Sequence, residues 1–466
     1  MEVAVVDKGG RGNVYAYSYA KSPRVSKVYV MPGNAGSALL SKCEQIPIQS
    51  IEEIIEFVEE NNLDLTDVGM EGYLSDGIVD KFLARGLEIV GPIQKATILE
   101  ASKCRTKDYL KQIGVPIPSH KNFDDVDKAK DFVRDFYRQH PEENVVVKAD
   151  GLAAGKGSLV CNSLEEALDS IDKIMVQKIF DDAGNMVDIE KRLYGWELMF
   201  FVLTDGETVL PLEAAMDYKP AFDKGDRRIR YFGGRNPNTG GMGGYSPHPW
   251  LDDELRKKIM DRIVTPTITN LHRYEDANLK EGDYKGVLYF GLMICQEDDE
   301  RNPYVEEINV RGGDPEAEII YPRLKTPLYD ISRVMLNGKL DQITLEWDPR
   351  YYVGIVAVSG PIVRSVQEER RGLKNLPGYP GEHMTNQPIQ GLREVDSCCL
   401  IFHNGTAFKD PSKGDRDNNI HTTGGRVLTL VAPGNTLQEA RDKAYGEIRK
   451  IWFRGIRYRR DTGSDK

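Results

Sequence analysis

Residues 145–158 combine two lysines with three glycines, a composition suited to binding phosphate. Lys148 ends an apolar, β-branched run, and Lys156 lies in the following loop, before another apolar run begins at Leu159. Glycines let backbone N–H groups approach an anion without a Cβ in the way, and a lysine at each end supplies positive charge. We therefore expect a strand, a phosphate-binding loop and a second strand; the alternative is an ordinary hairpin loop.

The spacing of this loop disfavours the P-loop and kinase classes. A Walker loop has four residues between its first glycine and Gly-Lys, followed by Ser or Thr and then a helix. Only three residues separate Gly151 from Gly155, and Gly157 stands where Ser or Thr is needed. The sequence also lacks the His-Arg-Asp and Asp-Phe-Gly motifs of a protein kinase.

A second group of residues has the chemistry of a divalent metal site. Apolar runs at residues 284–295 and 304–311, joined by a polar turn, predict a β-hairpin. Side chains alternate along a strand, so Glu307, Asn309 and Arg311 should share one face. Carboxylate and amide oxygens suit Mg²⁺, and a guanidinium suits a neighbouring anion; the alternative is a polar, solvent-facing side of the hairpin. The alternation places on the opposite face Glu306, Ile308 and Val310.

Alternating strand and helix patterns precede both motifs, up to about residue 100, and predict a doubly wound parallel sheet. After the first strand, Gly10 and Gly12 open a helix. Tyr15 occupies the place of the third glycine of the dinucleotide fingerprint, so we do not expect a nicotinamide cofactor. The helix N-terminus could still hold a phosphate. A linker that contains Pro116 and Pro118 predicts a domain boundary. From about residue 330 the pattern changes to short strands and turns, which indicates a further domain. We expect strands there at residues 343–346, 353–358, 400–403 and 427–431.

Composition narrows the class of protein further. The formal charge of the 466 residues is -11, which disfavours a dedicated nucleic-acid binder. Apolar runs are too short to span a membrane, and the six cysteines form no CxxC pattern. We expect a cytoplasmic protein with reduced thiols, acting on small molecules as a monomer or weak dimer.

Several motifs, in order along the chain, resemble the phosphoribosylamine–glycine ligase family of the ATP-grasp superfamily. The resemblance covers essentially the whole chain and rests on the phosphate loop and on these further segments: Pro32-Gly-Asn-Ala-Gly36, Pro237-Asn-Thr-Gly-Gly-Met-Gly243, Glu307-Ile-Asn-Val-Arg311, Gly313-Asp-Pro-Glu316, His403-Asn-Gly-Thr406 and Gly424-Gly-Arg-Val427. Several independent motifs in the right order are far more specific than any one of them.

The resemblance implies a reaction and an architecture. Such enzymes use ATP to join glycine to 5-phosphoribosylamine through glycyl phosphate, giving glycinamide ribonucleotide, ADP and phosphate in purine synthesis. The expected fold is α/β and α+β multidomain: an N-terminal Rossmann-like substrate domain (residues 1–101), an ATP-grasp domain of two subdomains (102–328) with a mobile lid at about 118–190, and a C-terminal mixed β domain (329–466). The cofactors implied are ATP and Mg²⁺, with Mn²⁺ possible.

The resemblance also implies roles for individual residues. Glu190 would take the adenine amino group and Glu197 the ribose hydroxyls, and the full ATP-binding set is Lys103, Lys107, Lys148, Gly151, Gly155, Lys156, Gly157, Glu190, Leu193 and Glu197. The substrate-binding residues that the resemblance implies are Gly10, Arg11, Asn34, Asp217, Asn238, Thr239, Gly240, Gly241, Arg311 and Asp314. The resemblance implies that Glu307 and Asn309 bind the metal. It implies catalytic roles for Arg311, Asp314 and Lys219. The preceding strand lacks the further carboxylate often present, so water or phosphate must complete the metal shell.

The departures from the family pattern lie mainly on the acceptor side. Where the family has Gly-Arg-Glu-His-Ala-Leu, this chain has Gly10-Arg-Gly-Asn-Val-Tyr15. Where the family has Arg-Phe-Gly-Asp-Pro-Glu, Gly312 replaces the phenylalanine. Asp217-Tyr-Lys-Pro220 replaces Asp-His-Lys-Arg and is followed by an insertion of roughly a dozen residues; another surrounds residues 365–376. Two alternatives follow: an ATP-grasp ligase with a changed acid or amine, and a regulatory protein that binds ATP without turnover.

Overall fold

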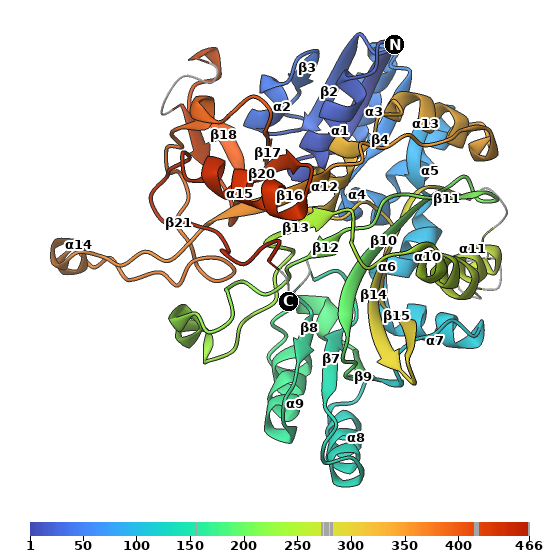
Figure 1. Ribbon diagram of the computed structural model, residues 1–466, viewed down its shortest axis with the longest axis vertical. Helices are drawn as coiled ribbons and strands as arrows, with labels where there is room; N and C mark the ends of the chain where they lie inside the picture. Colours follow the sequence, from blue (N-terminus) through green and yellow to red (C-terminus); the bar gives the residue numbers. More distant parts are fainter. Residues whose placement is uncertain (154–155, 272–273, 275–278, 280–282, 414–418, 465–466) are drawn as a thin grey trace.

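The structure is a computed structural model that describes residues 1–466 except 154–155, 272–273, 275–278, 280–282, 414–418 and 465–466 (Figure 1). In the described part of the chain, no helix is both long and apolar enough to cross a membrane.

The N-terminal segment forms the doubly wound parallel sheet that the sequence predicts. Its strand order is β3-β2-β1-β4-β5, with these bounds: β1 (Glu2–Asp7), β2 (Lys27–Pro32), β3 (Cys43–Gln45), β4 (Leu65–Val68) and β5 (Ile89–Pro92). Strands β1, β2, β4 and β5 are almost entirely buried on both faces because helices cover them, as parallel sheets require. Helix α1 (Gly10–Ala20) follows β1, and α3 (Ile51–Glu60) is capped by Ser50, whose side chain accepts from the Glu53 backbone N–H.

This sheet continues into the central segment. Strand β14 (Tyr284–Glu297) pairs with β5, β10 (Trp196–Thr204) pairs with β14, and β11 (Val209–Pro211) lies at the edge. Strand β15 (Glu300–Asn309) completes the predicted hairpin with β14. Nine strands therefore form one sheet, and its apolar residues, such as Phe200 and Phe290, are fully buried beneath helices. This continuity fixes the hairpin relative to the N-terminal strands.

The lid is a separate four-stranded antiparallel sheet, at the bottom of Figure 1. Its order is β6 (His120–Phe123), β9 (Val187–Lys191), β7 (Val145–Ala149) and β8 (Ser158–Val160). Helices α8 (Val126–Gln139) and α9 (Leu164–Ile171), capped by Asp125 and Ser163, cover one face and close a small core of their own. The lid is thus a compact unit with a core of its own.

The C-terminal sheet takes two strands from the central segment. Its order is β12 (Met216–Asp217), β13 (Gly243–Ser246), β16 (Tyr351–Ser359), β20 (Arg426–Gly434) and β17 (Leu400–His403), with β21 (Ile456–Arg457) on β16. Helix α15 (Leu437–Ile448) packs against β16 and β20. The prediction of a strand at residues 343–346 is wrong, because this segment pairs with no sheet. Its apolar side chains Ile343 and Leu345 pack instead on the core beside α13 (Leu328–Leu336).

The remaining named elements are short. They are α2 (Ala35–Leu39), α4 (Glu71–Ser75), α5 (Ile78–Ala84), α6 (Ile98–Ala101), α7 (Lys103–Gln112), α10 (Asp253–Ile259), α11 (Thr265–Thr269), α12 (Glu316–Ile320), α14 (Val366–Arg370), β18 (Thr406–Phe408) and β19 (Ile420–Thr422).

Candidate active site

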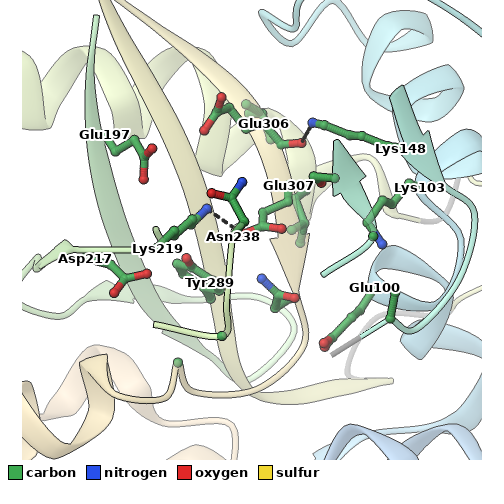
Figure 2. A pocket seen from close by; sticks show the side chains of 18 of the residues that line it. Glu100, Lys103, Lys148, Glu197, Asp217, Lys219, Asn238, Tyr289, Glu306 and Glu307 are labelled. Carbon is green, nitrogen blue, oxygen red and sulfur yellow. Dashed lines mark hydrogen bonds and ion pairs between the residues drawn. The ribbon is translucent and has the colours of Figure 1, made fainter. Parts of the chain in front are cut away.

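A cavity of about 470 Å³ lies where the lid, the large sheet and the C-terminal sheet meet. Figure 2 shows its side chains converging from α7, the lid, β10 and β15. Residues predicted from the sequence that line it are Arg11, Lys103, Lys107, Lys148, Gly157, Leu193, Glu197, Asp217, Lys219, Asn238, Thr239, Gly240, Glu307, Asn309, Arg311 and Asp314. The structure therefore brings together candidates from all parts of the chain up to Asp314.

Two lysines on the lid side are fixed by the same buried carboxylate. Lys107 Nζ lies 2.9 Å from Glu190 Oε1 and donates to the Val305 carbonyl at 2.7 Å. Lys148 Nζ lies 2.8 Å from Glu190 Oε2 and donates to the Glu306 carbonyl at 2.9 Å. Both ammonium groups are therefore held at the wall of the cavity in one orientation, which suits the phosphates of a nucleotide.

Glu190 itself does not line the cavity, and its charge is set by its neighbours. Burial alone would raise the pKa of Glu190, but Lys107 and Lys148 outweigh it and lower that pKa to about 2. Asp188, two residues earlier on β9, has its pKa raised to about 7 by burial and then by Glu190. The Asp188 carboxyl also lies 3.0 Å from His120 Nδ1. Glu190 is thus the anion that holds both lysines.

The phosphate loop is tied to α7 at its start. Lys103 donates to the Gly151 carbonyl at 2.8 Å, so Gly151 is part of the support for the cavity wall, whereas Lys103 is part of the wall. Lys156 lies outside the wall, with its Nζ 5.7 Å from the ring centroid of Tyr379. Gly155 lies outside the described residues.

Glu197, on β10, presents a carboxylate with a free acceptor. Its Oε2 is buried, and no described residue donates a hydrogen bond to it. A buried acceptor without a partner costs about 1–3 kcal/mol, so donors from a ligand would stabilise it. Leu193 contributes an apolar surface to the same cavity.

Glu307 and Lys219 form an ion pair in the middle of the cavity. Lys219 Nζ lies 3.1 Å from Glu307 Oε1, and Figure 2 shows the two side chains pointing toward one another. Burial alone would raise the pKa of Glu307, but Lys219 and then Lys148 lower it to about 2. Burial alone would lower the pKa of Lys219, but Glu307 raises it well above its ordinary value. Both groups are therefore charged at neutral pH.

The prediction that Glu306 lies on the strand face opposite Glu307 is wrong. The β14–β15 register shifts between Gly291 and Leu292, which face Glu307 and Val305, so Glu306 is the extra residue of a β-bulge. A bulge turns two consecutive side chains to one side, and Glu306 and Glu307 both line the cavity. Simple alternation fails here because it assumes an unbroken ladder.

The donor set fits a hard divalent cation only in part. Glu307 offers an ionised carboxylate, and Asn309 Oδ1 accepts a hydrogen bond from Arg311 Nη2 at 3.3 Å. Among the described residues, no group of three or more His, Cys, Asp or Glu side chains is arranged to hold a metal ion. Mg²⁺ is commonly bound through one or two carboxylates, with phosphate oxygens and water completing the shell. The two oxygen donors therefore fit a metal that arrives with a nucleotide.

Two arginines lie at the other end of the cavity among acidic partners. Arg11 contacts Asp7 and Glu71, each at 3.1 Å. Arg311 contacts Glu100 at 2.8 Å and Glu71 at 3.6 Å. The two guanidinium groups thus share Glu71, and they provide the donors that an anionic substrate group needs.

The C-terminal sheet also reaches this end of the cavity. Arg426 Nη1 lies 2.9 Å from Asp314 Oδ1 and donates to the Gly240 carbonyl at 2.6 Å. Asn404 Nδ2 donates to Asp314 Oδ1 at 3.3 Å. Asp217 lines the cavity as well, and burial and then Glu316 raise its pKa well above the ordinary value. Asp314 is therefore oriented by side chains that lie about a hundred residues further along the chain.

Three further predicted residues lie just behind the wall. Gly10 has no room for a Cβ, which would lie 2.1 Å from Glu318 Oε1. Asn34 Nδ2 donates to the His403 carbonyl at 2.7 Å and so joins the N-terminal and C-terminal domains. Gly241, with a φ of +108°, occupies backbone space that L side chains rarely adopt.

Several residues of the wall were missed from the sequence. They are Glu71, Glu100, Glu306, Glu316 and Arg426. Glu316 and Arg426 lie inside motifs that were recognised, so the signal was present, whereas Glu100 follows an apolar helix start and carries no local signal.

A solved structure of another protein shares this fold. The biotin carboxylase domain of Hydrogenobacter thermophilus 2-oxoglutarate carboxylase, solved with MgADP, matches with a TM-score of 0.65 at 14% identity, covering 98% of this chain and 91% of that one. At that identity the likeness concerns the fold alone. A family model of an ATP-grasp domain matches residues 101–317, and together with the fold and the cavity it defines an ATP-grasp protein.

The sequence comparisons give the particular family. Models of phosphoribosylglycinamide synthetase match residues 1–100 (N domain), 101–317 (ATP-grasp domain) and 376–465 (C domain). Curated phosphoribosylamine–glycine ligases of Archaeoglobus fulgidus and Caldanaerobacter subterraneus are 44% and 39% identical, and the alignments cover 100% of this chain and 99% and 100% of the relatives. The crystal structure of the Thermotoga maritima ligase matches with a TM-score of 0.76 at 27% identity, over 99% of this chain and 100% of that one. The chain belongs to the phosphoribosylglycinamide synthetase family.

Proposed function

We propose that this chain uses ATP to join glycine to 5-phosphoribosylamine, giving glycinamide ribonucleotide, ADP and phosphate in purine synthesis. The observation that carries the proposal is the meeting, in one cavity, of three lysines from α7 and the lid, the Glu307–Lys219 pair and two arginines. Relatives that align over the whole chain bear the name of this ligase. Each group of side chains in the cavity matches one component of the reaction.

The lid side suits ATP. Lys103, Lys107 and Lys148 would bind its phosphates as point charges. Glu197 has a free acceptor for the ribose hydroxyls, and Leu193 an apolar surface for the adenine. Glu190 has its carboxylate committed to the two lysines, so any contact with the adenine amino group adds to that role.

Glycine must be activated before an amine can attack it, because a carboxylate is a poor electrophile. Transfer of the γ-phosphoryl group to the glycine carboxylate forms glycyl phosphate, and Lys103, Lys107 and Lys148 would offset the charge that develops. No covalent intermediate with the enzyme is needed; the lid positions the reactants and excludes water. The amine then attacks the acyl carbon, and the bond to phosphate breaks.

Glu307 and Asn309 would hold Mg²⁺, with Mn²⁺ as an alternative, together with phosphate oxygens. When bound, the ion supplies charge neutralisation at the transferring phosphoryl group. Lys219, which pairs with Glu307 in the same part of the cavity, would offset negative charge on the reacting carboxylate, which gives it a catalytic role.

The acceptor end would bind 5-phosphoribosylamine. Arg11 and Arg311 offer guanidinium donors, and Asp314 offers a carboxylate held by Arg426. The remaining predicted substrate residues lie in or behind the same wall: Gly10, Asn34, Asp217, Asn238, Thr239, Gly240 and Gly241.

The proposed domain boundaries follow the packing. The boundary at 101 is supported by the junction between α6 and α7, and residues 118–190 by the separate core of the lid. Residues 351–359 form the centre of the C-terminal sheet as β16, which supports a C-terminal domain that starts near 329.

The test is phosphate release from ATP with purified protein. Release that requires both glycine and 5-phosphoribosylamine supports the proposal. Release with another acid and amine pair, but not with these two, would indicate a ligase with a changed substrate. Tight ATP binding with no release for any pair would indicate a regulatory ATP-binding protein.

A further inference from the structure

The carbonyl of Gly312 joins the two arginines at the acceptor end. Arg11 Nη1 donates to it at 2.9 Å and Arg311 Nη1 at 3.1 Å. Glu71 bridges the same guanidinium groups from another side, at 3.1 and 3.6 Å. The position of one peptide group therefore sets the spacing of both arginines.

Gly312 has no room for a side chain, and the obstacle is a single hydroxyl. A Cβ at this position would lie 2.4 Å from Tyr15 Oη, whereas Tyr15 Cζ and Arg11 Cδ would be 3.4 and 3.5 Å away, at ordinary contact distances. The φ of Gly312 lies outside the left-handed region, so its backbone conformation is open to alanine. Space, and not backbone geometry, requires glycine here.

Tyr15 is held firmly in this place. Its side chain is 2% exposed, and its ring packs edge-on against Tyr321 with centroids 5.0 Å apart. Tyr15 follows Arg11 by four residues on α1, so the two side chains lie on the same face of the helix. One turn of α1 thus supplies both the Arg11 guanidinium, which donates to the Gly312 carbonyl, and the Tyr15 hydroxyl, which occupies the space where a side chain of residue 312 would lie.

We propose that Tyr15 and Gly312 are a matched pair of positioning residues that sets Arg11 and Arg311 for a phosphate-bearing amine substrate. The proposal rests on the function proposed above and adds the residues that adjust its acceptor site.

A double-mutant cycle that differs by single atoms tests the pair. Gly312→Ala adds the Cβ, Tyr15→Phe removes the hydroxyl, and the double variant does both. Forcing an extra methyl group into a packed site displaces the neighbours, so Gly312→Ala should raise KM for 5-phosphoribosylamine about tenfold, with KM for ATP within about twofold. Tyr15→Phe alone should change KM less than about threefold, and the double variant should return to that level.

Binding of ribose 5-phosphate, measured by calorimetry on the same four proteins, should follow the same pattern without turnover. The pair is refuted if Gly312→Ala leaves KM and this affinity unchanged, if the double variant stays as impaired as Gly312→Ala, or if KM rises equally for ATP. Thermal melting checks that each variant is folded. Absence of wild-type turnover would overturn the proposed function alone, because the calorimetric cycle still reports on the pair.

Discussion

Replacing Glu307 by glutamine separates charge from shape at the centre of the cavity. Glu307 Oε1 lies 3.1 Å from Lys219 Nζ, and its pKa of about 2 makes it anionic at neutral pH. The glutamine oxygen can still accept a hydrogen bond from Lys219, so Glu307→Gln keeps the packing and removes one negative charge. If that charge holds the metal, the variant loses stabilisation of the transferring phosphoryl group.

The expected loss falls on turnover. Removing one group aimed at developing charge typically costs 10²–10³ in kcat, and a hundredfold loss corresponds to about 2.7 kcal/mol. We expect kcat to fall at least about a hundredfold, with the ATP dissociation constant within about threefold, because Lys103, Lys107 and Lys148 are unchanged. The assay is phosphate release under saturating substrates, with calorimetry for ATP binding and a titration of Mg²⁺.

The matched control is Glu300→Gln on the same hairpin, where the carboxylate is exposed and pairs with Lys258 outside the cavity. It should retain wild-type turnover. Near-normal turnover of Glu307→Gln, or an equal loss in both variants, would refute the reasoning.

Three other predictions follow from the lid. Lys148→Met removes a charge-assisted contact and should weaken ATP binding roughly tenfold to a hundredfold by calorimetry, whereas Lys191→Met, on the same sheet but paired with Glu143 at the surface, should not. The pKa of Asp188 is raised from 3.8 to about 7, so the folded state binds a proton that the unfolded state has lost, and the free energy of unfolding falls as pH rises from about 4 to about 7. Asp188→Asn should remove this fall in the free energy of unfolding, measured in urea at several pH values. An unchanged dependence on pH would contradict the prediction. Arg235, half-exposed beside Glu166 and Asp169 of α9, should contribute less than about 1 kcal/mol to unfolding, and high salt should abolish the difference between wild type and Arg235→Ala.

The sequence predicts the parts of the fold that local patterns encode. The alternating strands and helices up to about residue 100 and the hairpin formed by β14 and β15 follow from periodicity, and the structure confirms them. The joining of β5 to β14 is different, because those strands are far apart in the chain and their edges pair through backbone groups that leave no trace in side-chain pattern.

The residues of the candidate site also divide into those that local patterns reveal and those that only the fold brings together. Lys148 and Glu307 were found because a loop and a strand carry recognisable residue types at short spacing. Glu306 was misplaced because a bulge breaks the alternation, and the hold of Glu190 on two lysines depends on a sheet register that no single strand shows. Arg426 contacts Asp314 only through the folding of the C-terminal sheet over the cavity.

The acyl phosphate step is the central chemical claim, and isotope transfer tests it most directly. Glycine labelled with ¹⁸O in its carboxylate is turned over with ATP and 5-phosphoribosylamine, and the released phosphate is examined by mass spectrometry. Activation as glycyl phosphate leaves one carboxylate oxygen on the phosphorus, so each phosphate should carry one ¹⁸O. Unlabelled phosphate released together with product would contradict the account.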